Sequence, residues 1–213
     1  MTDKTTIAQT LTKQDLLQVV AIAKAAGDAI MTVYGQDDFS VSHKGDDSPV
    51  TAADLAAHHV IVAALAKQFV GIPIMSEEAA DIAWDERRQW QTYWLIDPLD
   101  GTKEFIKRNG EFTVNIALVQ QGRPLLGVVH VPTSDTTYLG VLAAQQPESL
   151  GAWKYTAGHS PQAIRVRDLE ARAAAQLPLT LLLSHRHGTQ ATSELLNLLE
   201  RRWPGPIETC NAG

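Results

Sequence analysis

The chain is poor in the residues that mark secreted, disulfide-stabilised or nucleic-acid-binding proteins. It has one cysteine, Cys210, in 213 residues, which excludes an intrachain disulfide framework and fits a reducing compartment. Lys and Arg number 18 against 24 Asp and Glu, a formal net charge of −6, and no Lys- or Arg-rich run offsets it. This charge balance disfavours nucleic acid as a partner.

Long apolar runs are scarce as well. Residues 1–12 are polar and lack the apolar stretch of a secretory signal. No segment approaches the roughly 20 uninterrupted apolar residues that cross a bilayer. We therefore expect no transmembrane segment and a cytoplasmic location, with peripheral attachment to the cytoplasmic face of the inner membrane left open. The apolar share of 45% still allows a substantial core.

Apolar periodicity predicts a mixed α/β fold of helices alternating with hairpins. Residues 13–35 and 51–69 have helical spacing, and residues 112–131 predict a hairpin. The apolar positions expected to face the core of the two helices are Leu16, Val20, Ala23, Gly27 and Ile30 in the first, and Leu55, Val62, Leu65 and Phe69 in the second.

The pattern also predicts two domains, with the boundary in a loop-rich stretch. Residues 1–150 are expected to form an N-terminal α+β domain, and residues 151–213 the start of a C-terminal α/β domain. In the latter, residues 179–183 predict a mostly buried strand. Residues 192–202 predict a helix with Leu195, Leu196 and Leu199 facing inward.

The most informative segment is Trp-Leu-Ile-Asp-Pro-Leu-Asp-Gly-Thr-Lys-Glu-Phe, residues 94–105. Its apolar start predicts a strand that delivers Asp97 and Asp100 to a turn, which Pro98 stiffens. Gly101 and Thr102 then place backbone N–H groups at a helix start. Paired carboxylates beside such a backbone are typical of a divalent cation bridging to phosphate, although an ordinary Asp- and Gly-rich surface turn remains the alternative.

Two upstream segments add acidic groups at element ends. A short predicted strand, residues 72–75, runs into Ser76-Glu77-Glu78. Residues 44–51 form a polar turn before a helix, where Thr51 and Asp54 have the spacing of a capping box. Acidic clusters at three strand or loop ends favour a site over three unrelated surface turns.

Together these motifs resemble the magnesium-dependent, lithium-sensitive inositol monophosphatase superfamily. Residues 97–102 are similar to its DP(I/L)DGT signature, and Ser76-Glu77-Glu78 is similar to its (G/S)EE element. The block from Lys44 to Asp54 and the extension over residues 101–106 resemble its 3′(2′),5′-bisphosphate nucleotidase branch, of the bacterial CysQ type. The resemblance runs from about residue 13 to the end. It implies the layered α-β-α-β-α sugar-phosphatase fold.

The resemblance also implies roles for individual residues. Two or three Mg²⁺ ions, with inhibition by Li⁺, are expected on the metal ligands Glu77, Asp97, Leu99 (through its carbonyl) and Asp100. The catalytic pair that positions and deprotonates the attacking water is expected to be Asp46 and Thr102. The expected substrate contacts are Glu77, Leu99, Asp100, Gly101 and Thr102, joined by Ser184 and His187, which match part of the (S/T)RSH block of the nucleotidase branch.

One element of the family pattern is missing from these 213 residues. The family carries a further metal-binding Asp in a downstream Trp-Asp-x-(Ala/Gly) motif. The only Trp-Asp pair here, Trp84-Asp85, precedes the signature, and Trp203 is followed by Pro204. We therefore expect an incomplete second domain and a second cation that is one ligand short.

The expected function is that of a magnesium-dependent phosphatase acting on a small nucleotide. By resemblance, it hydrolyses the 3′-phosphate of adenosine 3′,5′-bisphosphate (PAP) to give AMP and phosphate, in sulfur assimilation and nucleotide recycling. The sulfated nucleotide PAPS is a second expected substrate. Two alternatives stay open: an inositol or fructose phosphate phosphatase, and an inactive metal- or nucleotide-binding fragment.

Overall fold

The computed structural model describes residues 11–36, 41–43, 49–79, 82–142, 147–184 and 190–212. The chain divides into two compact units, unit 1 (Met1–Ile164) and unit 2 (Arg165–Gly213). The sequence-based boundary after residue 150 lies earlier than this division. The difference arises because residues 151–164 form two strands that pair into the sheet of unit 1.

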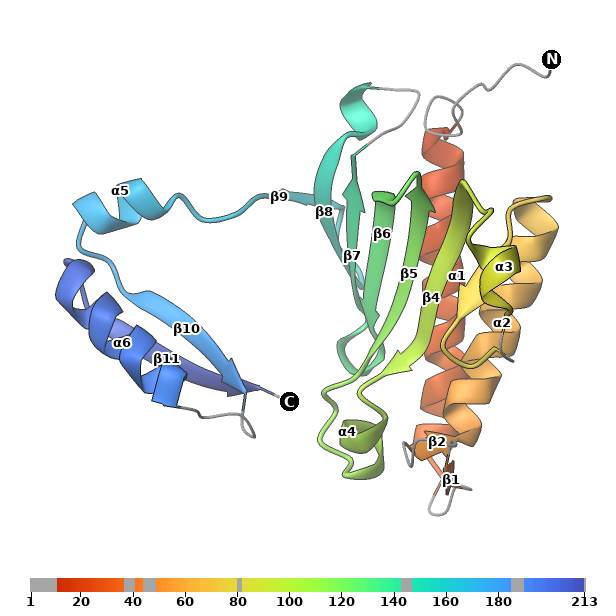
Figure 1. The fold of residues 1–213 in the computed structure, drawn as a ribbon, viewed down its shortest axis with the longest axis horizontal. Helices are drawn as coiled ribbons and strands as arrows, with labels where there is room; N and C mark the ends of the chain where they lie inside the picture. Colours follow the sequence, from red (N-terminus) through yellow and green to blue (C-terminus); the bar gives the residue numbers. More distant parts are fainter. Residues whose placement is uncertain are drawn as a thin grey trace. The chain divides into compact units, whose positions relative to one another are not determined.

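A seven-stranded sheet forms the centre of unit 1, in the order β3-β4-β5-β6-β7-β8-β9 (Figure 1). β3 and β4 are parallel, and every other pair of neighbours in this sheet is antiparallel. The strands are β3 (Ile74–Ser76), β4 (Thr92–Asp100), β5 (Thr113–Gln120), β6 (Arg123–Val131), β7 (Thr136–Val141), β8 (Gly151–Thr156) and β9 (Gln162–Ile164). The predicted hairpin over residues 112–131 is therefore confirmed as β5 and β6.

Two long helices, α1 (Lys13–Tyr34) and α2 (Ala52–Gln68), pack together against one face of this sheet (Figure 1). α1 begins at Thr12, which forms a capping box with Asp15 and so satisfies backbone donors of the first turn. All five α1 residues expected to face the core are buried. The 3.6-residue period was sufficient to find this buried face.

By length and composition alone, α1 is also apolar enough to cross a membrane, the one such helix among the described residues. The sequence-based expectation that no segment approaches this length did not foresee it. Its buried residues are Leu16, Val19, Val20, Ile22, Ala23, Ala26, Gly27 and Ile30, which belong to the core of unit 1. The apolar character of α1 is thus accounted for by burial against α2 and the sheet.

The buried face of α2 agrees only in part with the predicted stripe: Leu65 is buried, and Val62 and Phe69 are partly buried against the core. Its buried residues are Ala53, Asp54, Ala57, Ile61 and Leu65, whereas Leu55 is 44% exposed. The small side chains of Ala53 and Ala57 allow close helix packing, and the buried Asp54 is hydrogen-bonded. An apolar stripe alone could not locate this face, because part of it is alanine and part of it is a carboxylate.

Short elements complete unit 1 around the ends of the sheet. They are β1 (Val41–His43), β2 (Pro49–Thr51), α3 (Trp84–Arg87), α4 (Thr102–Ile106), η2 (Pro132–Ser134) and η3 (Pro147–Ser149). Phe105 of α4 packs with Phe112 and Tyr34, with ring centroids about 5 Å apart. These edge contacts fix α4, which directly follows β4, against the end of the core.

Unit 2 contains α5 (Leu169–Ala174), β10 (Leu179–Ser184), α6 (Gln190–Arg202) and β11 (Ile207–Ala212), with β10 and β11 parallel. None of its side chains that the structure describes is buried. The prediction of a mostly buried strand over residues 179–183 is wrong at Leu182, which is 72% exposed, and Leu195 on α6 is 51% exposed. The sequence pattern located the strand and the helix, but it carries no information about whether another layer covers their apolar side chains.

Candidate metal and phosphate site

The end of β4 is irregular at the point where its two carboxylates lie. Asp97 pairs with Asn115 and Asp100 pairs with Thr113, so three steps along β4 oppose two along β5. One extra residue is therefore accommodated as a β-bulge, next to Pro98, which has no N–H to donate to the ladder. Leu99 turns its side chain into the core and Asp100 is exposed. The bulge thus brings Asp97 and Asp100 to the same face, although residues three apart in a regular strand face opposite sides.

Asp97 is the half-buried member of this acidic cluster. Its Oδ1 is one of two buried side-chain nitrogen or oxygen atoms without a hydrogen-bond partner among the described residues. Burial raises the pKa of Asp97 to about 7, and the charges of Glu77 and Asp100 and a hydrogen bond with Glu77 add to the rise. A carboxylate in this position is costly unless a cation compensates it.

Glu77 reaches the cluster from the neighbouring strand. It directly follows β3, and its backbone N–H donates to the carbonyl of Ile96 on β4 at 3.1 Å. Because β3 and β4 are parallel, their carboxyl ends meet at the same edge of the sheet. The parallel pairing therefore brings together two motifs that are separate in the sequence.

Asp100 is held from the other side by β5. The Asn115 amide donates to Asp100 Oδ2 at 3.1 Å, and the Thr113 hydroxyl donates to Asn115 Oδ1 at 3.1 Å. The threonine contact orients the Asn115 amide so that its nitrogen faces the carboxylate. Sequence reasoning missed Asn115, because its position opposite the carboxylates depends on the bulged register.

Thr102, the first residue of α4, is hydrogen-bonded to a carboxylate of α2. Its hydroxyl lies 3.0 Å from Asp54 Oδ1 and 3.3 Å from the Leu99 carbonyl, either of which can accept its hydrogen. Asp54 Oδ2 accepts from the backbone N–H of Thr51 at 2.7 Å and from its hydroxyl at 2.6 Å. Asp54 therefore serves at once as a helix cap and as the partner of Thr102. The sequence analysis gave it only the first of these roles.

Three predicted site residues are not placed by the structure. Asp46 and His187 lie outside the described residues, as does the side chain of Ser184 at the end of β10. Their catalytic and substrate-binding roles stay predictions. Among the predicted residues, unit 1 brings together Glu77, Asp97, Leu99, Asp100, Gly101 and Thr102 around the carboxyl ends of β3 and β4.

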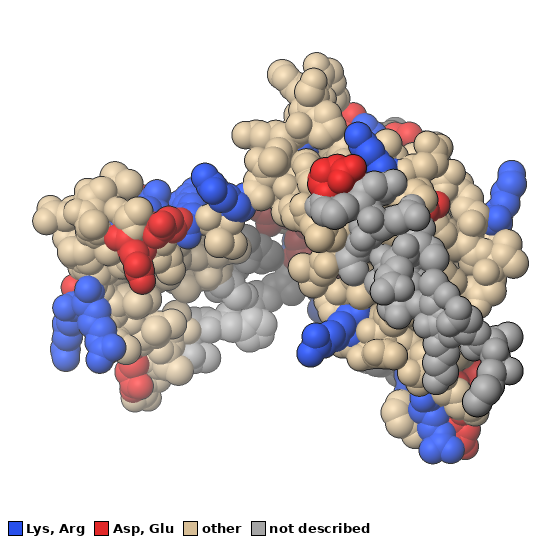
Figure 2. Space-filling model, turned by 90° about the horizontal axis from the view of Figure 1, so that it is seen from above, with Lys and Arg blue, Asp and Glu red and all other residues tan. Residues whose placement is uncertain are grey.

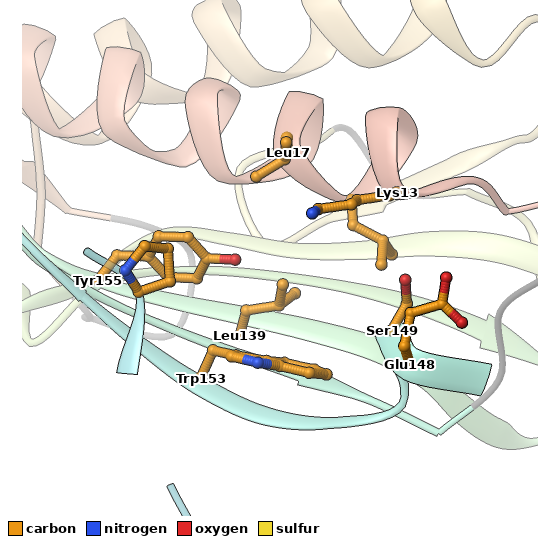
Figure 3. A pocket seen from close by; sticks show the side chains of 9 residues that line it. Lys13, Leu17, Leu139, Glu148, Ser149, Trp153 and Tyr155 are labelled. Carbon is orange, nitrogen blue, oxygen red and sulfur yellow. The ribbon is translucent and has the colours of Figure 1, made fainter. Parts of the chain in front are cut away.

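A cavity of about 530 Å³ opens beside the cluster, on the sheet face opposite the helices. Its lining includes Glu77, Asp97 and Asn115. A second cavity, of about 360 Å³, lies between α1 and β7–β8, where Lys13 and Leu17 face Trp153 and Tyr155 (Figure 3). None of the predicted site residues lines this second cavity, so the acidic cluster and its neighbouring cavity form the candidate site.

The donor set of the cluster fits a hard divalent cation. Glu77, Asp97 and Asp100 offer carboxylate oxygens, and the Leu99 carbonyl lies beside them in the chain. Within the described part of the chain, no group of three or more His, Cys, Asp or Glu side chains is arranged to hold a metal ion by itself. Mg²⁺ retains several waters and binds through one or two carboxylates plus substrate phosphate, so it does not need an all-protein cage.

Comparison with known proteins defines the class: the chain belongs to the inositol monophosphatase family, whose model matches residues 11–205. Among its relatives is a protein named 3′(2′),5′-bisphosphate nucleotidase CysQ, from Salmonella typhimurium. It is 50% identical over 185 residues, which cover 86% of this chain and 69% of the relative. The protein of the same name from Escherichia coli is 48% identical over 183 residues, covering 85% of this chain and 68% of the relative.

The fold is similar to that of solved members of the family. The crystal structure of CysQ from Bacteroides thetaiotaomicron matches with a TM-score of 0.70 and 33% identity, over 94% of this chain and 73% of that chain. An inositol monophosphatase from Thermotoga maritima matches with a TM-score of 0.65 and 26% identity, over 92% of this chain and 68% of that chain. The predicted mixed α/β fold is confirmed.

Proposed function

We propose that this chain carries the site of a Mg²⁺-dependent phosphatase that removes the 3′-phosphate from PAP, giving AMP and phosphate. The names of the relatives at 48–50% identity support a bisphosphate nucleotide as substrate. The observation that carries the proposal is the buried, unpartnered Asp97 Oδ1, whose carboxyl has a raised pKa beside Glu77 and Asp100. Such an arrangement favours a bound divalent cation over a merely structural turn.

The residues that would hold Mg²⁺ are Glu77, Asp97, Asp100 and the carbonyl of Leu99. When bound, Mg²⁺ supplies Lewis-acid catalysis: it stabilises negative charge on the transferring phosphoryl group and acidifies water. The family is magnesium-dependent, whereas the presence of two or three ions and inhibition by Li⁺ belong to the proposal. Asn115 keeps the Asp100 carboxylate oriented through its amide.

Thr102 and Asp54 are proposed to orient the attacking water. When the Thr102 hydroxyl donates to Asp54, its oxygen lone pairs are left to accept a hydrogen bond from water. Asp54 is held by two hydrogen bonds from Thr51, so the pair has little freedom to turn. General-base assistance of this kind contributes about 10²–10⁴-fold. Asp46 stays a further prediction for the same step.

The remaining predicted contacts concern the substrate. Gly101 and Thr102 are proposed to bind the phosphate through their backbone N–H groups, and Ser184 and His187 to contact the nucleotide. PAPS is proposed as a second substrate, in sulfur assimilation and nucleotide recycling. Basic and acidic side chains are interspersed on the surface seen in Figure 2, which agrees with a small-molecule partner and not nucleic acid. A cytoplasmic location is proposed, and no described feature supports attachment to the inner membrane.

The experiment is a panel of phosphate esters assayed for released phosphate, with and without Mg²⁺. We expect PAP to be preferred over PAPS, inositol monophosphate and fructose 1,6-bisphosphate, with no turnover after chelation of the metal. Preference for inositol monophosphate would contradict the substrate, and metal-independent turnover would contradict the mechanism. Metal binding without turnover of any ester would favour the inactive binding protein.

The assay is repeated on two variants. Asp97→Asn alters the acidic cluster, and Asp85→Asn on the exposed helix α3 is its control. Asp97→Asn removes one charge from the cluster and should lower kcat/KM at least about 100-fold, since Lewis-acid stabilisation contributes several kcal/mol. The Asp85 carboxylate forms an ion pair with the surface side chain of Arg88, and the other contact of Asp85 uses its backbone carbonyl, which the substitution keeps. Asp85→Asn should therefore leave kcat/KM unchanged. Equal kcat/KM values for the two variants would contradict the assignment of Asp97 to the site.

A further inference from the structure

Besides the Asp54–Thr102 contact, α2 makes a side-chain contact with the turn that carries Glu77. His58 Nδ1 lies 2.8 Å from the hydroxyl oxygen of Ser76, the last residue of β3. The same hydroxyl oxygen accepts the backbone N–H of Glu78 at 3.2 Å, and the Ser76 carbonyl accepts that of Ala79 at 3.2 Å. The hydrogen bonds to Ser76 thus close the turn on both sides of Glu77.

The position of His58 on α2 gives this contact its importance. His58 follows Asp54 by four residues, so the two side chains project from the same face of the helix. Asp54 bonds Thr102 at the start of α4, and His58 bonds Ser76 at the end of β3. One turn of α2 therefore holds two separate loops of the candidate site. One loop carries Thr102, which is proposed to position water, and the other carries Glu77.

We propose that His58 is a positioning residue: through Ser76 it fixes the turn that presents the Glu77 carboxylate to the divalent cation. This inference rests on the proposed function. Partial burial and the neighbouring His59 both lower the pKa of His58, which favours the neutral ring that can either donate to or accept from a hydroxyl. Residues that orient a metal ligand typically affect metal affinity 10–100-fold when removed.

The test measures binding of Mn²⁺ alone to the metal-free protein, by titration calorimetry, for a set of matched variants. His58→Ala removes the contact, and His58→Asn restores it because the Asn amide reaches the place of the ring Nδ1. His159→Ala is the control, since His159 is an exposed histidine in the turn after β8 and lies outside α2 and the Glu77 turn. We expect about tenfold weaker Mn²⁺ binding for His58→Ala, near-normal binding for His58→Asn, and no change for His159→Ala.

Ser76→Ala gives the second arm and serves if His58→Ala does not fold. It should weaken Mn²⁺ binding to a similar extent, and the double variant should be no worse than either single one. Unchanged Mn²⁺ affinity in folded His58→Ala and Ser76→Ala, with only the melting temperature lowered, would overturn the positioning role alone. Failure of the unaltered protein to bind Mn²⁺ in a manner sensitive to Asp97→Asn would overturn both this inference and the proposed function.

Discussion

Units 1 and 2 both combine helices with strands, but they differ in how far their side chains are buried. In unit 1, two helices cover a seven-stranded sheet and bury side chains such as Ile61, Trp94 and Leu126 completely or nearly so. In unit 2, two parallel strands and two helices leave every described side chain at least partly exposed. An apolar strand becomes a core strand only when another layer covers it, and parallel pairs depend on such cover.

The largest expected effect comes from the same truncation made in each unit. Leu126→Ala on β6, where the side chain is 1% exposed, should cost about 2–5 kcal/mol of unfolding free energy through lost burial and the cavity left behind. Leu182→Ala on β10 should change it by less than about 0.5 kcal/mol. Urea unfolding followed by circular dichroism measures both. Equal costs would show that β10 is packed like a core strand.

An intermediate effect is expected at a glycine of unit 2, where tight packing involves the backbone. A Cβ on Gly205 would lie 2.5 Å from the carbonyl oxygen of Gln176, whereas one on Gly140 of unit 1 would meet nothing within 4 Å. Gly205→Ala should therefore destabilise unit 2 by about 1–3 kcal/mol, and Gly140→Ala should be nearly neutral. Amide hydrogen exchange in β10 and β11 reads out the change. Unaltered protection in Gly205→Ala would contradict the close approach.

A third expected effect is the pH dependence that the site gives to unit 1. The pKa of Asp97 rises from 3.8 to about 7 in the folded protein, so the folded state binds this proton more tightly than the unfolded state. The stability of the metal-free protein should therefore fall as pH rises from about 4 to about 7. Melting temperatures across this range should decline less in Asp97→Asn, and added Mg²⁺ should oppose the decline. Identical pH profiles for the two proteins would contradict the shifted pKa.

Much of unit 1 was predictable from local pattern. The helical period located the buried face of α1, and the alternation around residues 112–131 located the β5–β6 hairpin. The acidic motifs were also visible, because their carboxylates stand directly at the ends of predicted strands. The association of Glu77 with Asp97 required the parallel pairing of β3 with β4, which no local pattern specifies.

The missed features depend on contacts between distant segments. Asp54 looked like a helix cap, and its bond to Thr102 spans 48 residues of sequence. Asn115 meets Asp100 only because the β4–β5 register shifts by one residue. In unit 2, Leu182 and Leu195 have the spacing of core residues, but spacing carries no information about whether another layer is present.

The β-bulge at the end of β4 also sets what kind of sequence change the site tolerates. Successive side chains in a strand point to opposite faces, so the number of residues between Asp97 and Asp100 decides whether their side chains lie on the same face. Replacing Leu99 by another apolar residue preserves the count. Deleting one residue there would leave two steps on each strand, which a regular ladder accommodates with both carboxylates on one face, whereas inserting one residue would turn the two carboxylates to opposite faces unless a second bulge formed. The segment should therefore be permissive toward many substitutions and least tolerant of an inserted residue.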